Sequence, residues 1–396
     1  MKEPPYAWVV VWATFACLAL IFGVSYAFAA FFESFVSAFN APRAEVALVF
    51  GLSGGVYFAA GAAAGLLSDR FGPRAVTAAG MLCVAAGLAA SSLAPSILAV
   101  YAAYGVGVGI GIALVYTPAM ANVPPWFSQR RGLASGLASA GIGFGTVLVP
   151  LLATRLIAGL GWRTALQCLA LGVLVLGLGA AWLLRRAPVA NAAPGKAAVP
   201  GATLGQAMRS ADFQRLYAVC VLASPAMFVP FAHVSAAARD LGVPAAQAVG
   251  LVGLIGAGSL VGRFAIGALA DRLGRARTLA LVLASMGLSF GLWWLAGGYA
   301  ALAGFALWMG LSYGGIVALL PALCMDLFGA RAVAAILGTL YTGAAVGNLL
   351  GPWLAGAVFD RFGSYTPVLA VCGLGCALAT VAAMGLGQHR PGEVVE

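Results

Sequence analysis

One arginine in this 396-residue sequence lies deep inside a long apolar stretch. Arg263 stands about eighteen residues into the run 245–269, and no acidic residue lies within one helical turn of it. A charge at the centre of a membrane helix costs about 2.5–3.5 kcal/mol on insertion scales, and such residues usually mark a substrate or ion path. Because a planar guanidinium suits two-point contact with a carboxylate, we expect Arg263 to bind an organic anion. The alternative is a structural pair with an acid from another helix, or a side chain that snorkels towards the cytoplasmic surface.

A histidine in the run 213–238 is the second candidate for chemistry. His233 is one of only two histidines in the chain. Imidazole is the side chain that most readily gains and loses a proton near neutral pH. We therefore expect His233 to contact the substrate and to carry a coupled proton. The alternative is a buried, hydrogen-bonded histidine in an aromatic setting.

Four tyrosines in apolar runs are candidates for shaping a binding cavity: Tyr26, Tyr116, Tyr313 and Tyr341. A tyrosine can donate its hydroxyl to a carboxylate while its ring excludes water. Asn348 follows Tyr341 by seven residues, so the two share a helix face. The alternative for all of these residues is ordinary packing between helices.

The composition determines what kind of protein must hold these side chains. The chain is 63% hydrophobic and 8% charged, whereas soluble globular proteins carry about a quarter charged residues. With so few charged residues the chain could not cover a water-facing surface, which excludes a soluble enzyme, a nucleic-acid-binding module and a disordered tail. The net charge of +10 does not indicate nucleic-acid binding, because the basic residues lie between apolar runs. The seven cysteines fall inside those runs without the close pairs of a zinc site, so we expect no metal and no cofactor.

Twelve apolar runs are long enough to cross a bilayer, which takes about 20 residues. They cover 6–36, 45–67, 74–94, 97–124, 132–157, 163–184, 213–238, 245–269, 277–297, 299–325, 332–358 and 365–387. A proline-containing polar stretch separates the sixth run from the seventh. We therefore predict an N-terminal six-helix bundle at 1–186, a linker at 187–211 and a C-terminal six-helix bundle at 212–396.

The basic residues orient these runs. With the N-terminus inside, fifteen of the 21 lysines and arginines lie in inside segments and five in outside segments, and Arg263 lies within a run. Positive residues concentrate on the cytoplasmic side of membrane proteins. We therefore expect a multi-pass protein of the cell (inner) membrane, with both termini and the linker cytoplasmic.

The two halves repeat one another at a shift of 202 residues. This shift places 65–72 onto 267–274, and it places Gly141, Gly145 and Pro150 onto Gly343, Gly347 and Pro352. The pattern predicts an all-α polytopic membrane protein of twelve transmembrane helices in two pseudo-symmetric six-helix bundles. In transporters built this way, the substrate site lies between the halves near the membrane midplane.

The repeated segment carries a family resemblance. The stretch Gly65-x-x-x-Asp69-Arg70-x-Gly72-x-Arg74 and its copy Asp271-Arg272-x-Gly274 resemble the loop signature of the major facilitator superfamily. The resemblance implies that Asp69, Arg70, Arg74, Asp271 and Arg272 form a conformational latch that holds the outward-open state. The alternative is a charge cluster that sets topology around an ordinary turn.

Three further segments are similar to particular branches of that superfamily. Residues 5–10 and Ser25-Tyr26-Ala27-Phe28 resemble the first helix of monocarboxylate transporters, and 126–136 also resembles the oxalate–formate antiporters. The resemblance adds Phe28 to the substrate-binding candidates. The chain has Ala30 and Ala344 where these two families, respectively, carry a further membrane-embedded cation. With Arg263 alone, a monoanion is favoured over a dianion, whose second carboxylate would be buried unpaired.

Together these features predict a secondary transporter of a small monocarboxylate such as lactate or pyruvate. An interior-negative potential expels a lone monoanion, so we expect a coupled proton. The expected partners are therefore the carboxylate, a proton and the lipid bilayer, with no nucleic acid, and we expect a monomer. The alternatives are an organic-anion antiporter, a drug exporter of the same fold, or a membrane sensor that does not transport and would carry an appended soluble domain.

Overall fold

The computed structural model describes residues 4–127, 131–186, 201–329 and 331–387. Its helices are α1 (Pro5–Phe39), α2 (Arg43–Phe71), α3 (Pro73–Ser92), α4 (Ile97–Val100), η1 (Tyr101–Val108), α5 (Gly109–Asn122), η2 (Pro124–Trp126), α6 (Arg131–Gly172), η3 (Val173–Gly177), α7 (Leu178–Leu183), α8 (Leu204–Arg209), α9 (Ala211–Asp240), α10 (Ala245–Leu273), α11 (Arg275–Trp294), α12 (Tyr299–Phe328), α13 (Val333–Phe362) and α14 (Thr366–Met384). The described residues contain no β-strand, which confirms the predicted all-α class.

The helices follow the predicted apolar runs closely. By length and composition, ten described segments can cross a membrane, and one of them, Ala134–Leu183, combines the fifth and sixth predicted runs. The chain turns within that segment at Gly161, whose φ of +79° interrupts the helical backbone. The eleventh predicted run forms α13, a helix of 30 residues. All twelve predicted runs are therefore helical.

The repeated loop motif makes the same turn in both halves. Gly72 separates α2 from α3 with φ +88°, and Gly274 separates α10 from α11 with φ +84°. An L-residue with a side chain rarely adopts such a φ, whereas glycine does so freely. One glycine is therefore enough to connect two antiparallel membrane helices.

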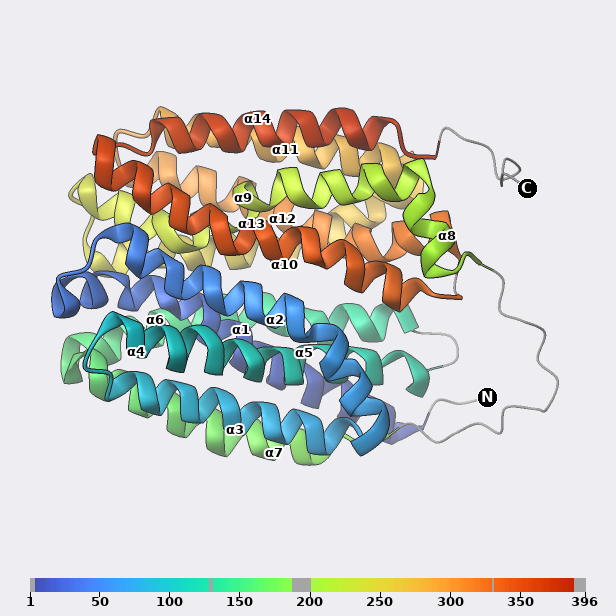
Figure 1. The fold of residues 1–396 in the computed structure, drawn as a ribbon, viewed down its shortest axis with the longest axis horizontal. Helices are drawn as coiled ribbons and strands as arrows, with labels where there is room; N and C mark the ends of the chain where they lie inside the picture. Colours follow the sequence, from blue (N-terminus) through green and yellow to red (C-terminus); the bar gives the residue numbers. More distant parts are fainter. Residues whose placement is uncertain (1–3, 128–130, 187–200, 330, 388–396) are drawn as a thin grey trace.

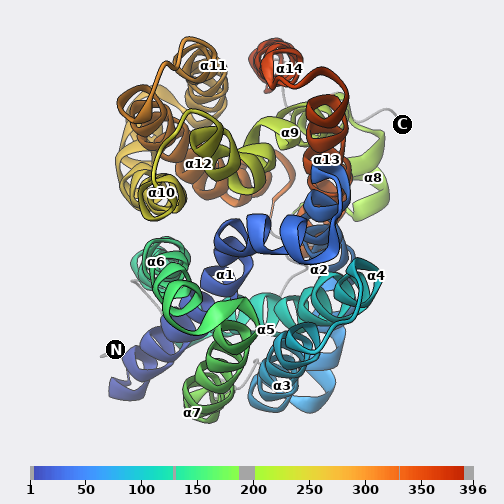
Figure 2. The same cartoon turned by 90° about the vertical axis from the view of Figure 1, so that its left-hand side faces the viewer.

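The helices gather into two bundles. Figure 2 shows α1 to α7, coloured blue to green, on one side and α9 to α14, yellow-green to red, on the other. Within the bundles α1 packs on α6 and α10 on α12, and between them α2 packs on α13 and α6 on α10. The two interface pairs flank a central region between the bundles.

Matching glycines let helices approach closely in each bundle. A Cβ added to Gly145 on α6 would overlap the carbonyl oxygen of Ala19 on α1. A Cβ added to Gly347, its counterpart at the 202-residue shift, would overlap Ser224 on α9. Small residues at such positions allow membrane helices to pack backbone against backbone. The sequence repeat thus corresponds to the same packing contact in both halves.

The start of α1, the end of α14 and the short helix α8 lie at one end of the molecule (Figure 1). The loops that follow α1, α9 and α13 lie at the other end, called the outer end below. The predicted linker 187–211 contains the short helix α8, which its composition did not indicate. α8 begins with a capping box, in which Thr203 and Gln206 satisfy each other's backbone amides.

Candidate functional site

A cavity lies between the bundles and is lined by helices of both. Among the described residues, its walls consist mostly of aromatic and aliphatic side chains, and Arg263 is the one charged residue in them. The lining residues are Phe22, Tyr57, Phe58, Tyr116, Ile142, Val219, Cys220, Ala223, Met227, Phe228, Arg263, Tyr313, Ile316, Val317, Leu320, Tyr341 and Ala344. Apolar walls with a few polar groups are typical of small-molecule sites.

Arg263 is a buried cation of this cavity whose guanidinium is not fully hydrogen-bonded by the described residues. It is 9% exposed on α10, and its Nε and Nη2 are buried without a hydrogen-bond partner among the described residues. No aspartate or glutamate occurs among the described lining residues. An ion held away from water costs several kcal/mol unless it is compensated. An anion that enters this cavity would therefore gain a desolvated, directional partner.

Three of the four predicted tyrosines line the same cavity: Tyr116, Tyr313 and Tyr341. Sequence reasoning missed Tyr57, which lies on α2 just after the glycines that bring this helix onto α13. The glycines at 51, 54 and 55 could have indicated its role, because they bring α2 close to α13 and residues next to this contact face the other bundle. Four tyrosines therefore line the cavity that contains Arg263.

Tyr26 lies beside the cavity, and its hydroxyl is 3.0 Å from that of Tyr313. Phe28 is fully buried inside the N-terminal bundle against Phe50 and Tyr104. Its ring lies on the face of α1 that packs into its own bundle, so we leave Phe28 out of the binding set. Asn348 is not among the lining residues either, because its amide packs against Gly54 at the α2–α13 contact.

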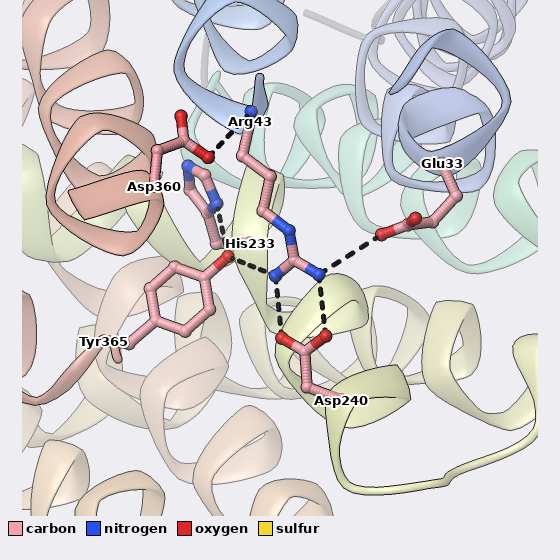
Figure 3. A network of polar contacts seen from close by, with 6 residues as sticks. All are labelled: Glu33, Arg43, His233, Asp240, Asp360 and Tyr365. Atoms are coloured by element: carbon pink, nitrogen blue, oxygen red, sulfur yellow. Dashed lines mark hydrogen bonds and ion pairs between the residues drawn. The ribbon is translucent and has the colours of Figure 1, made fainter. Parts of the chain in front are cut away.

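A polar network joins the two bundles at the outer end (Figure 3). The guanidinium of Arg43, on α2, donates two hydrogen bonds of 2.7 Å to the carboxylate of Asp240, on α9. It also donates to the Tyr365 hydroxyl at 3.0 Å and lies 3.8 Å from Glu33. The Phe359 ring covers it at 4.1 Å. Arg43 of the N-terminal bundle thus contacts several side chains of the C-terminal bundle.

Asp360 of α13 caps the first turn of α2 from the opposite bundle. Its carboxylate accepts hydrogen bonds from the backbone N–H of Arg43 at 3.1 Å and of Ala44 at 2.8 Å. The residue before α2 is Pro42, whose side chain has no acceptor, so the helix has no cap of its own. Unpaired amides at a helix N-terminus attract an anionic acceptor. The cap of α2 therefore depends on the two bundles staying together at this end.

His233 belongs to this network and not to the cavity lining. It is fully buried, with Nε2 2.8 Å from the Pro352 carbonyl oxygen and Nδ1 3.0 Å from the Tyr365 hydroxyl. A carbonyl only accepts, so Nε2 carries a proton and donates to it. A neutral ring then accepts from Tyr365 at Nδ1. The structure therefore does not bring His233 together with Arg263.

Tyr365 connects His233 to Arg43. It lies in the turn between α13 and α14, outside the membrane-spanning segments, and burial raises the pKa of its phenol, an effect that the nearby Arg43 opposes. The hydroxyl therefore stays protonated at neutral pH and can donate to Nδ1 of His233 while it accepts from Arg43. If His233 gained a proton at Nδ1, the Tyr365 hydroxyl would have to accept a hydrogen bond from the imidazole instead of donating one to it.

The predicted cytoplasmic latch is only partly described. The side chains of Asp69 and Asp271 lie outside the described residues. Arg74 donates to the Leu184 carbonyl at 3.1 Å, and Arg70 lies over the neighbouring Phe71 ring. Arg272 is exposed. The described contacts of Arg70 and Arg74 stay within one bundle, so the latch remains a prediction.

Comparison with known proteins adds independent information. Residues 14–352 and 218–395 match the sequence profile of the Major Facilitator Superfamily. Monocarboxylate transporter 13 of Bos taurus is 32% identical over 376 residues, which cover 94% of this chain and 88% of that protein. Monocarboxylate transporter 3 of Rattus norvegicus is 32% identical over 395 residues, covering 95% and 79%. A solved bacterial homolog of the human lysosomal transporter Spinster superposes with a TM-score of 0.74 at 16% identity, covering 97% of this chain and 98% of that one. The structural likeness concerns the fold alone.

Proposed function

The chain belongs to the major facilitator superfamily and is a multi-pass membrane transporter rather than an enzyme, and on this premise we propose that it carries a small monocarboxylate held by Arg263. One observation supports the proposal most strongly. A buried guanidinium without a carboxylate partner among the described residues faces a cavity that both bundles line. The two relatives compared above are named monocarboxylate transporters, which agrees with an anion at this position.

The composition of the cavity narrows the substrate class. A monoanion balances Arg263, whereas a second carboxylate would meet no further cation among the described lining residues. An ammonium group would meet no acid there, which disfavours zwitterionic amino acids and lipophilic cations. The drug-exporter alternative therefore loses support. An organic-anion antiporter would use the same site and is distinguished by its need for a counter-anion.

We propose that the transporter works by alternating access, with the outer end facing the outside and the termini in the cytoplasm. The inside-positive distribution of basic residues supports this orientation. For the cavity to open outward, Arg43 must leave Asp240, and the first turn of α2 must lose Asp360. The outer network thus acts as a gate in this scheme.

We also propose that a proton accompanies the substrate, carried by His233 or by the substrate carboxylate itself. Moving one charge across the membrane changes the free energy by about 2.3 kcal/mol per 100 mV, and a co-transported proton cancels that term. His233 would act through Tyr365 and the outer gate, because it lies outside the cavity lining.

Uptake of radiolabelled L-lactate into proteoliposomes tests these proposals. Arg263→Gln should remove saturable uptake, since breaking a buried charge pair costs about 2–5 kcal/mol, or at least roughly thirtyfold in affinity. Arg263→Lys should retain part of it. Arg277→Gln, at an exposed position on α11, is the matched control and should transport normally.

Undiminished uptake by Arg263→Gln would reject the binding site. Uptake that does not respond to an inward proton gradient would reject proton coupling. Uptake that requires lactate or another anion inside the vesicles would instead favour the antiporter.

A further inference from the structure

Two tyrosines from opposite bundles meet beside the cavity. The hydroxyls of Tyr26 on α1 and Tyr313 on α12 are 3.0 Å apart and buried, although 287 residues separate them in the chain. Both rings contact Phe231: Tyr26 stacks on it at 4.1 Å, and Tyr313 meets it edge-on at 5.4 Å. This shared ring fixes the geometry of the pair, which links the bundles through one hydrogen bond.

The two hydroxyls face different surroundings. Tyr313 lines the cavity that contains Arg263, whereas Tyr26 does not. A hydroxyl has one proton to donate and two lone pairs to accept with. If Tyr26 donates to Tyr313, the proton of Tyr313 is left for an acceptor inside the cavity. The opposite arrangement would leave the proton of Tyr26 directed away from the cavity lining.

We propose that the Tyr26–Tyr313 pair couples substrate occupancy to contact between the bundles. This inference rests on the proposed function, because the acceptor it requires is a carboxylate bound at Arg263. Such a carboxylate would accept from Tyr313, which would in turn accept from Tyr26. A charged acceptor strengthens a hydrogen bond, and bonds in a chain polarise one another. Tyr26 is therefore a positioning residue that acts through Tyr313.

The consequence is a link whose strength depends on the substrate. In the empty transporter the bundles share a neutral hydrogen bond at this point. With a carboxylate in place, the chain runs from α1 through α12 to the substrate and Arg263 on α10. The occupied cavity should therefore favour the state in which the bundles are joined on its outer side.

Paired spin labels at Ala38→Cys and Leu241→Cys measure this effect. Both positions are exposed at the outer end, one on each bundle. The purified full-length chain is reconstituted in nanodiscs, and distances are recorded with and without saturating L-lactate; the labelled native chain gives the background from its own cysteines. Lactate binding to the same samples is measured by calorimetry.

We expect lactate to raise the ratio of short to long distances about fivefold in the otherwise native chain, the change that one hydrogen bond gives. Tyr26→Phe should bind lactate within about threefold of the native affinity but lose this response. Tyr313→Phe should lose the response and also bind about fivefold more weakly. Tyr104→Phe is the control, because it removes a buried tyrosine bond, to the Val24 carbonyl, within one bundle. It should respond like the native chain.

The results separate the two proposals. A full lactate response in Tyr26→Phe, or lactate binding without any response in the native pair, would overturn the coupling while leaving the binding site intact. Lactate binding that Arg263→Gln does not weaken would overturn the proposed function, and the coupling with it.

Discussion

The outer gate allows the sharpest quantitative prediction. Arg43→Gln combined with Asp360→Ala removes the ion pair to Asp240 and the cap on α2 together. Both contacts cross from one bundle to the other, so both exist only while the outer ends stay joined. Within the N-terminal bundle, the substitutions also remove the 3.8 Å contact between Arg43 and Glu33, which does not depend on the C-terminal bundle. The double variant should therefore shift the transporter toward a state that is open at its outer end.

The size of the shift follows from the contacts that are lost. Loss of a helix N-cap costs about 1 kcal/mol. The Arg43 and Asp240 side chains are 15% and 37% exposed, so their pair is partly screened and contributes at most about 1 kcal/mol. About 2 kcal/mol in total corresponds to a roughly thirtyfold change in the ratio of joined to open molecules. Because the pair is partly exposed, raised salt should mimic part of its loss.

The spin-label pair at Ala38 and Leu241 provides the assay, now without substrate. The double variant should shift population from short to long outer-end distances. Arg239→Gln removes an exposed arginine one residue before Asp240 and should leave the distribution unchanged. If the double variant has the distance distribution of the native chain, the outer network does not hold the bundles together, and the reasoning is refuted.

Three further predictions follow from the packing and the cavity. Gly145→Leu and Gly347→Leu should each lower the free energy of unfolding by about 1–3 kcal/mol or more, because the new side chain overlaps the neighbouring helix. Gly172→Leu is the control and should be tolerated, because Gly172 faces open space. Thermal unfolding of the purified variants measures these differences. His233→Ala should destabilise the fold by about 1–3 kcal/mol, because the buried hydrogen bonds of His233 to the Pro352 carbonyl and the Tyr365 hydroxyl are lost, yet L-lactate affinity measured by calorimetry should stay within about threefold. Pyruvate should compete with lactate uptake, while malonate and alanine at tenfold higher concentration should not, since the cavity offers one cation and no described acid.

Much of the architecture could be predicted because it depends on helix length and on repetition. The apolar runs predicted all twelve membrane helices, and the 202-residue shift identified the glycines that pack α6 on α1 and α13 on α9. Arg263 was found because a lone charge in an apolar run is conspicuous in any sequence. These features are local, or they recur at a constant spacing.

The rest of the site depends on which helices become neighbours. Nothing near Arg43 in the sequence indicates that Asp240 and Asp360 will meet it from the other half of the chain. His233 has the chemistry of a proton carrier, but the rotation of α9 places it against Tyr365 and Pro352, away from the cavity lining. Tyr57 was overlooked because aromatic residues are common in membrane helices.

The repeat also shows where function departs from symmetry. At the 202-residue shift Arg263 corresponds to Gly61, Arg43 to Ala245, Asp240 to Ala38 and Asp360 to Ala158. Each of these four charged residues thus has an alanine or a glycine at the equivalent position in the other half. The packing glycines, by contrast, are retained in both halves. In the proposed mechanism, a symmetric scaffold lets two similar bundles rock against each other, whereas a small anion has one charged end and is bound from one side only. The sequence therefore contains the packing residues of the scaffold twice, but the charged residues of the cavity and the gate only once. Aligning the two halves of the chain is enough to identify these four charged positions.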